Sequence, residues 1–245
     1  MTTHKKFFLI LWALGFVGIL SFLFIDLAGI IEILPSDVEV PPMAPWLIKG
    51  LSLIQPTVIL SIAVLVGIGL APKVGLSAPV AESLAKNENW FPALKPQIVP
   101  GIIGGVISGL AIVVTAALLK PLLPAEAVVL IGKFGNVLPL PTRFLYGGVT
   151  EELLLRWGLM TLLAWLAWRL FQKGQGSPRS SCFVAAILVS SLIFGIGHLP
   201  VAFLLFPHPT PTLILFVLTA NSTFGLIAGY LYWKKGLESA MIGTS

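Results

Sequence analysis

Two glutamates and an arginine interrupt an apolar stretch of the chain that extends from about Phe144 to Leu170. They are Glu151, Glu152 and Arg156, in the order Glu-Glu-x-x-x-Arg. A charged side chain near the centre of a bilayer costs about 2.5 to 3.5 kcal/mol on insertion scales. Three of them in one apolar helix therefore indicate a functional site rather than a chance arrangement.

The spacing of these three residues predicts two different roles. On a helix, Glu152 and Arg156 lie four residues apart on one face, so their charges can neutralise each other. Glu151 lies about 100° around the helix from Glu152 and has no partner within the motif. We therefore predict that Glu152 and Arg156 form a supporting ion pair and that Glu151 is available for chemistry.

A histidine later in the chain is the natural partner for Glu151. His198 closes the segment Phe-Gly-Ile-Gly-His at 194–198 and is the only histidine within a predicted span. Taken alone, His198 is interpreted as a structural histidine that is hydrogen-bonded to a backbone carbonyl near a helix end. Paired with Glu151, it completes the minimum set for activating a water: the carboxylate accepts the proton while the imidazole positions the water or returns the proton.

A third polar residue, Asn221, also lies within a predicted span. One interpretation is a hydrogen bond to a neighbouring helix, which is common and contributes about 0.6 kcal/mol on average. The other is a polar contact to a substrate carbonyl or oxyanion, and both interpretations stay open. His208 lies between prolines and is predicted to be an exposed loop residue.

The composition places these residues in a membrane. The chain has 245 residues, of which 57% are hydrophobic and 10% charged, with a mean hydropathy of +0.99. A soluble domain has about 25% charged residues, so we predict a single integral membrane domain over 1–245. The net charge of +5 fits basic residues gathered on the cytoplasmic side and not nucleic-acid binding. The lone Cys182 excludes an intramolecular disulfide and a Cys-rich metal site, and is read as a packing residue.

The hydropathy pattern predicts an all-α polytopic transmembrane bundle of about six or seven spans with short surface helices. The expected spans are 7–31, 51–70, 98–119, 142–171, 182–199 and 212–233. A short surface helix is expected at 78–87 with a cap at Ser77, a short amphipathic or re-entrant piece at 125–137, and the start of another helix at 237–242. Asp26 falls near the end of the first span, and the glycine-rich third span is expected to be central. An acidic, proline-bearing loop at 32–45 and a proline-rich connection at 207–211 join the spans.

Basic residues predict the orientation. An N-terminus on the cytoplasmic side leaves an excess of Lys and Arg inside, which favours that arrangement. The loop between the third and fourth spans opposes it, because it places Lys120, Lys133 and Arg143 outside. The first apolar run is long and lacks a small-residue cleavage site, so we expect a retained span. The predicted location is the plasma (inner) membrane.

From about Leu145 to Ile242, the chain resembles the CPBP family (CaaX proteases and bacteriocin-processing enzymes). These intramembrane proteases are also called Abi or type II CaaX prenyl endopeptidases. The resemblance rests on Glu-Glu-x-x-x-Arg at 151–156, on Phe-x-x-x-His at 194–198, and on the run 221–232 followed by 236–242. It indicates a family-like catalytic core at 142–242, while the N-terminal spans are only generically similar.

The resemblance implies roles for these residues. Glu151 is the implied general base on the attacking water, His198 its partner, and Glu152 with Arg156 the supporting pair. The family is described both as metal-dependent and as glutamate-dependent. A divalent metal such as zinc, with Glu151 and His198 as candidate ligands, and no cofactor at all are therefore both left open.

One family motif is not found in the printed sequence. The family's last motif is a second His placed just after a run like Ser-Ala-Met-Ile at 239–242, where this chain reads Gly243-Thr244-Ser245. We expect either a clipped or altered end, which the stop a few residues into a helix favours, or a member that lacks part of the machinery. Glu151, Glu152 and His198 would make a poor zinc site by themselves, because a catalytic zinc takes three convergent ligands.

The leading hypothesis is an intramembrane endopeptidase that cleaves a lipidated or prenylated protein, a peptide precursor or another membrane protein, in contact with membrane lipid. The alternative is a catalytically silent scaffold of the same fold. A transporter is a third reading, since buried charges also mark ion pathways. However, no repeat of broken helices in two halves is visible. Neither the substrate nor the oligomeric state follows from the sequence.

Overall fold

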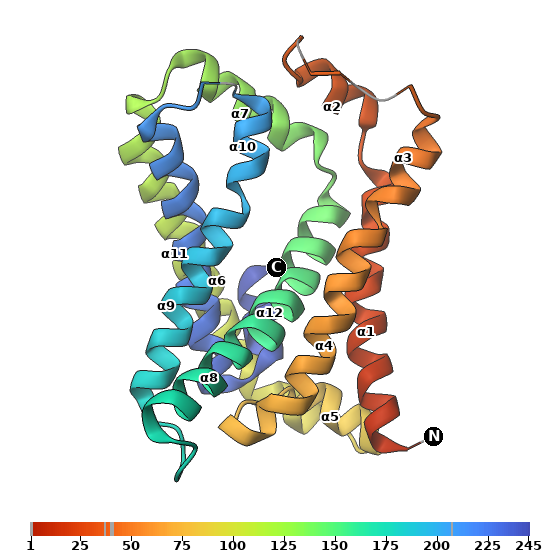
Figure 1. The fold of residues 1–245 in the computed structure, drawn as a ribbon, viewed down its shortest axis with the longest axis vertical. Coiled ribbons are helices and arrows are strands. Elements are labelled where there is room, and N and C mark those ends of the chain that lie inside the picture. The colour runs from red at the N-terminus through yellow and green to blue at the C-terminus, as the bar shows by residue number, and fades with distance from the viewer. Residues whose placement is uncertain (1, 37, 40–41, 207) are drawn as a thin grey trace.

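The computed structural model describes residues 2–36, 38–39, 42–206 and 208–245, and Figure 1 shows its fold. The described residues are helical and contain no strand. The α-helices are α1 (Thr3–Leu20), α2 (Leu27–Ile33), α3 (Pro45–Ser52), α4 (Ile54–Val74), α5 (Pro79–Lys86), α6 (Phe91–Leu119), α7 (Ala125–Val137), α8 (Thr161–Gln172), α9 (Ser180–Gly197), α10 (Leu199–Leu205), α11 (Pro211–Lys235) and α12 (Leu237–Thr244). Short 3-10 turns are η1 (Ser21–Phe24) and η2 (Lys120–Leu122), and π-helical segments are η3 (Thr142–Thr150) and η4 (Leu153–Met160).

The prediction of an all-α polytopic bundle is confirmed. In the part of the chain that the structure describes, six helical stretches are long and apolar enough to cross a membrane. They are Thr3–Phe24, Pro45–Val74, Phe91–Leu122, Thr142–Gln172, Ser180–Leu205 and Pro211–Lys235. The segment at 125–137, for which an amphipathic and a re-entrant piece were both considered, forms the helix α7. The predicted loop features at Asp37, Pro41 and Pro207 lie outside the described residues.

The first span ends earlier than predicted, at Phe24 instead of residue 31. Asp26 is the N-cap of the separate helix α2, and its side chain accepts a hydrogen bond from the Ala28 amide at 3.1 Å. An N-cap aspartate satisfies an amide that a helix start leaves unpaired. Asp26 therefore starts a new helix rather than closing the first one. Pro200 likewise does not stop the helical path, because it sits in the first turn of α10, where a missing amide hydrogen does no harm.

The predicted cap of the short surface helix at Ser77 is wrong. Helix α5 is capped by carboxylates instead: Glu82 accepts a hydrogen bond from the Ala78 amide, and Glu238 of α12 accepts from the Val80 and Ala81 amides. Burial raises the pKa of Glu238, against the lowering effect of these amide hydrogen bonds. The contact fixes the start of α12 against the start of α5.

The helices form two groups with one helical path between them (Figure 1). Helices α1 and α4 pack against each other, while α6, α9 and α11 form the other group. The path η3–η4–α8 carries the Glu-Glu-x-x-x-Arg motif. It contacts α1 and α4 on one side and α9 on the other, so the motif lies where the two groups meet.

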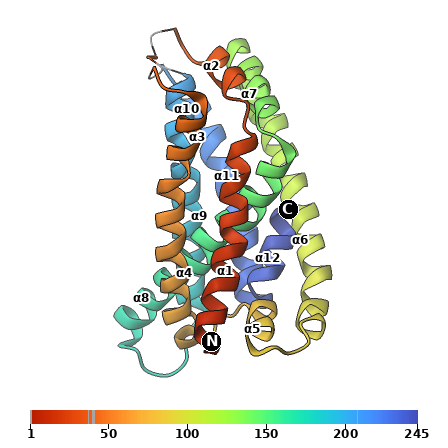
Figure 2. The ribbon, with the colours of Figure 1, turned by 90° about the vertical axis from the view of Figure 1, so that its right-hand side faces the viewer.

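The last helix turns back into the bundle. Gly236 has φ 114°, a backbone conformation that side chains rarely adopt, and it reverses the chain between α11 and α12. Helix α12 packs against α6, α11 and η3. Figures 1 and 2 show it ending about halfway along the bundle.

Helix α6 does not occupy the central place expected from its glycines. One face packs closely on α11 and α12: a Cβ at Gly104 would lie 2.6 Å from Leu231, and one at Gly101 would lie 2.7 Å from Ile242. The remaining surface is exposed along most of the helix, including Val99, Ile102, Ile103, Val106 and Leu110. The glycines let α11 and α12 approach one face of α6 closely, but they do not require a neighbour on the opposite face. Helix α6 is therefore an outer helix (Figure 2).

The packing of α6 on α12 is testable with one methyl group. In Gly101→Ala, the new Cβ meets the Ile242 side chain and the Ser239 carbonyl, the latter at 3.0 Å. We expect a loss of about 1–3 kcal/mol in unfolding free energy from overpacking, measured in detergent micelles. Gly109→Ala is the matched control, because nothing lies within 4 Å of its Cβ. Equal stability of the two variants would contradict the close contact.

Candidate active site

The two glutamates of the motif lie between two π-helical segments. The Glu151 amide donates to the Tyr146 carbonyl, five residues earlier, and the Thr161 hydroxyl reaches the Arg156 carbonyl across the same interval at 3.2 Å. π-Helical turns are rare and frequent at functional sites. The sequence analysis assumed a regular α-helix over this stretch and had no means of detecting the wider turn.

The predicted ion pair is present and fully enclosed. Arg156 Nε lies 3.2 Å from Glu152 Oε2, and each side chain is 2% exposed. These two atoms are not aligned as a hydrogen bond and have no other hydrogen-bond partner among the described residues. The contact is therefore an attraction between charges in an apolar interior, where neither charge could be buried without the other.

Arg156 also reaches the two helices that carry the other site residues. Its Nη2 donates to the Gly225 carbonyl of α11 at 3.1 Å, and its guanidinium lies 5.4 Å from the centre of the Phe194 ring of α9. A cation over an aromatic face is attracted to it. The Phe194 ring in turn packs edge-to-face against the His198 ring, with 4.7 Å between the ring centres. The pair thus braces the His198 helix as well as its own.

Glu151 is turned to a different place from Glu152. It lines two adjoining cavities of about 540 and 460 Å³, and His198 and Asn221 line both of them as well. The structure therefore brings together the three candidate residues from η3–η4, α9 and α11. The larger cavity is walled mainly by apolar side chains of η1, α2, α7, α10 and α11, such as Phe22, Ile131, Leu205 and Phe216.

The hydrogen bonds of His198 and Asn221 define what each has left to offer. His198 Nδ1 lies 2.9 Å from the Phe194 carbonyl, which only accepts, so Nδ1 carries the proton and Nε2 is left for other partners. Asn221 donates to the Val217 carbonyl of its own helix at 2.8 Å. This bond replaces the expected one to a neighbouring helix. The second amide hydrogen and the amide oxygen of Asn221 remain.

Two residues that line these cavities were missed by sequence reasoning. Arg143 lines both, together with Gly147, and Thr244 at the end of α12 lines the smaller one. Arg143 was considered only as a marker of orientation. A signal was present nonetheless, because Arg143 precedes Glu151 by two helical turns within the same span. Thr244 gave none, since its place depends on the reversal at Gly236.

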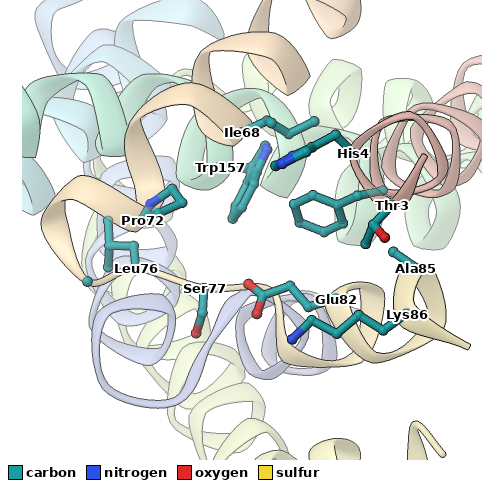
Figure 3. Close-up of a pocket in the computed structure, with 12 residues that line it drawn as sticks. Thr3, His4, Ile68, Pro72, Leu76, Ser77, Glu82, Ala85, Lys86 and Trp157 are labelled. Atoms are coloured by element: carbon teal, nitrogen blue, oxygen red, sulfur yellow. The ribbon is translucent and has the colours of Figure 1, made fainter. Parts of the chain in front are cut away.

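A separate cavity of about 460 Å³ lies at the end of the bundle near the N-terminus. It also contains an imidazole and a carboxylate, from His4 and Glu82. Figure 3 shows His4 on one side with Trp157, and Glu82 with Lys86 on the other. The Glu82 carboxylate already accepts a hydrogen bond from the Ala78 amide. Its role as a cap accounts for Glu82. Trp157 is buried in the core.

Among the residues that the structure describes, the Glu151 site supplies too few ligands for a catalytic zinc. Over the described residues, no three His, Cys, Asp or Glu side chains are grouped so as to hold a metal ion. Glu152 faces Arg156, which leaves Glu151 and His198 as ligands, whereas a catalytic zinc takes three protein ligands and an open position.

The fold and site define a multi-pass helical membrane protein with a carboxylate, an imidazole and an amide around an intramembrane cavity. Residues 133–243 match the family of type II CAAX prenyl endopeptidase Rce1-like proteins. This matched region includes the Glu-Glu-x-x-x-Arg and Phe-x-x-x-His motifs, and it supports the resemblance to the CPBP/CAAX protease family. No curated protein and no solved structure matches the chain.

The bracing role of the buried pair predicts strongly non-additive stability effects. Arg156→Met leaves the Glu152 charge buried without a partner, and we expect a loss of about 3–5 kcal/mol in unfolding free energy. Combining it with Glu152→Gln should cost less than the sum of the single changes. The measurement is a double-mutant cycle of unfolding in micelles.

Arg179→Met, at the exposed N-cap of α9, is the control for removing an arginine and should change little. Additive single and double effects would show that Glu152 and Arg156 do not act as a unit.

Proposed function

We propose that this protein is an intramembrane endopeptidase in which Glu151 activates a water to hydrolyse a peptide bond. The observation that carries the proposal is that Glu151, His198 and Asn221, from three different helices, line the same two cavities. The pair Glu152–Arg156 is excluded from them. The family match supports a protease in general terms, and the arrangement of side chains supports the specific roles.

In the first step, the Glu151 carboxylate accepts a proton from a water as its oxygen attacks the scissile carbonyl carbon. The new C–O bond leaves a tetrahedral centre with negative charge on the former carbonyl oxygen. Asn221 has an amide hydrogen that is not used by Val217 and can donate it to this oxygen. Donors placed where charge develops stabilise the transition state.

In the second step, the C–N bond breaks and the leaving amine takes a proton. Glu151 can return the proton that it accepted, so the protein is unchanged after one turnover. His198 Nε2 is free because Nδ1 is bonded to the Phe194 carbonyl. In its neutral form Nε2 accepts a hydrogen bond from the attacking water and so fixes the water's orientation.

The cavity also suggests the substrate class. Its larger part is apolar, about 540 Å³ in volume, and lined by phenylalanine, isoleucine and leucine side chains. This volume is in the range of drug-sized ligand pockets and suits a hydrocarbon chain near the reacting carbonyl. With the prenyl endopeptidase description of the family, we propose a lipid-modified peptide or protein as the substrate.

The charge distribution supports an N-terminus on the cytoplasmic side of an inner or plasma membrane. Figure 1 places the N-terminus, α5 and the end of α8 at the same end of the bundle. Lysines near these points, such as Lys5, Lys6, Lys73 and Lys86, favour the cytoplasmic face for that end.

Replacing the base provides the direct test. Glu151→Gln keeps the shape of the side chain but cannot accept the proton, and we expect at least about a 100-fold fall in kcat. In the assay, the protein encoded by the whole gene is reconstituted in liposomes and incubated with a prenylated peptide. The released product is measured by mass spectrometry.

Glu126→Gln is the matched control, since Glu126 is exposed on α7 and lines neither cavity. Full activity of Glu151→Gln would contradict the proposal. Inactivity of the unaltered protein toward all lipidated peptides, with normal folding, would favour the silent scaffold.

A further inference from the structure

A single basic residue faces the cavities at Glu151. Arg143 lies in the first turn of η3, and it is the only Lys or Arg among the described residues that line either cavity. Arg143 is exposed and is the second residue of the span Thr142–Gln172, near the end of the helix, where a long basic side chain reaches the membrane surface at little cost. The roles proposed for Glu151, His198 and Asn221 leave Arg143 unexplained.

The guanidinium of Arg143 is held in place but not neutralised. Its Nε donates to the Leu138 carbonyl at 2.9 Å and its Nη2 donates to the Gly135 carbonyl. Over the described residues, no Asp or Glu lies within 4.0 Å of it, since the only such pair is Glu152–Arg156. Two of its five N–H groups are used, which leaves three donors and a full positive charge.

These carbonyls belong to the end of α7, so Arg143 also serves as a cap there. A cation near a helix C-terminus is stabilising by itself, by about 0.3–1 kcal/mol. A cap alone, however, does not require a residue that lines two cavities beside Glu151. The two roles are compatible, because the cap fixes the position of a charge whose remaining donors are free.

Arg143 and Glu151 line the same two cavities. Gly147 lies between them and lines both cavities as well. The only atom within 4 Å of a Cβ built at Gly147 would be Glu151 Oε2, at 4.0 Å. Arg143 precedes Glu151 by eight residues on one helical path, so a peptide bound in these cavities can contact both side chains.

We propose that Arg143 binds the C-terminal carboxylate of the peptide substrate and so determines how far from the chain end the bond is cut. The inference rests on the proposed function of Glu151 and names a specificity-determining residue for it. A guanidinium matches a carboxylate in charge and planar geometry and can bind it through two parallel hydrogen bonds. The carboxylate then lies on the same chain as the bond that Glu151 attacks.

The test compares two substrates that differ only at the chain end. One lipidated peptide ends in a free carboxylate and the other in a carboxamide, and both are assayed with the unaltered protein, Arg143→Gln and Arg143→Lys. The unaltered protein should prefer the carboxylate by about 10- to 100-fold in kcat/KM, as expected for hydrogen bonds to charged groups. Arg143→Gln should lose this preference through KM, and Arg143→Lys should retain part of it.

The same comparison separates the cap from the binding role. If Arg143 only caps α7, Arg143→Gln lowers activity on both peptides by the same factor, and the inference is overturned. Absence of any preference in the unaltered protein also overturns it. Lys133→Gln on α7 removes a nearby exposed charge that lines neither cavity, and should leave the ratio unchanged.

Peptide binding to a variant that cannot cleave tests the role of Arg143 separately from the role of Glu151. The Glu151→Gln variant should bind the fluorescent carboxylate peptide about 10-fold or more tightly than the carboxamide, and adding Arg143→Gln should abolish the difference. Equal binding of both peptides sinks the role of Arg143. Activity that survives Glu151→Gln instead sinks the proposed function, whatever the binding shows.

Discussion

The enclosed contact between Glu152 and Arg156 is the constraint on which the site depends. Neither charge can remain in an apolar interior alone, so both side chains are fixed by the requirement to meet. Arg156 extends this constraint to α11 through the Gly225 carbonyl and to α9 through the Phe194 ring. Three helices that are distant in sequence are thereby held in one arrangement, and the neighbouring Glu151 is left facing the cavities.

The division of labour between adjacent glutamates explains why the motif contains two. The pair satisfies a structural demand on one side of the helix, and the unpaired carboxylate faces a space lined by polar groups from α9 and α11. His198 is connected to both functions, since its ring contacts Phe194 and its Nδ1 bonds the Phe194 carbonyl. The supporting glutamate, Glu152, and the glutamate proposed to react, Glu151, are thus adjacent residues of the same helix.

The sequence was sufficient for interactions that depend on local spacing. The four-residue interval predicted the contact of Glu152 with Arg156, and the apolar runs predicted six spans. The wider turns of η3 and η4 were not predicted, because the sequence argument assumed a regular α-helix over this stretch. The outer position of α6 was missed for a related reason: close glycine packing on one face says nothing about what covers the other. The cavity role of Arg143 required knowing where α7 ends in space.

The outer position of α6 has a mechanical consequence. A helix of 29 residues is about 44 Å long, whereas the hydrocarbon layer of a bilayer is about 30 Å thick. The start of α6 contains Lys95 and Gln97, so the helix either reaches beyond the hydrocarbon layer or tilts across it, and any tilt responds to the thickness of the membrane. Because α6 carries α12 against its glycine face, and α12 ends at the smaller cavity with Thr244, the lipid composition of the membrane has a direct physical route to the shape of the site.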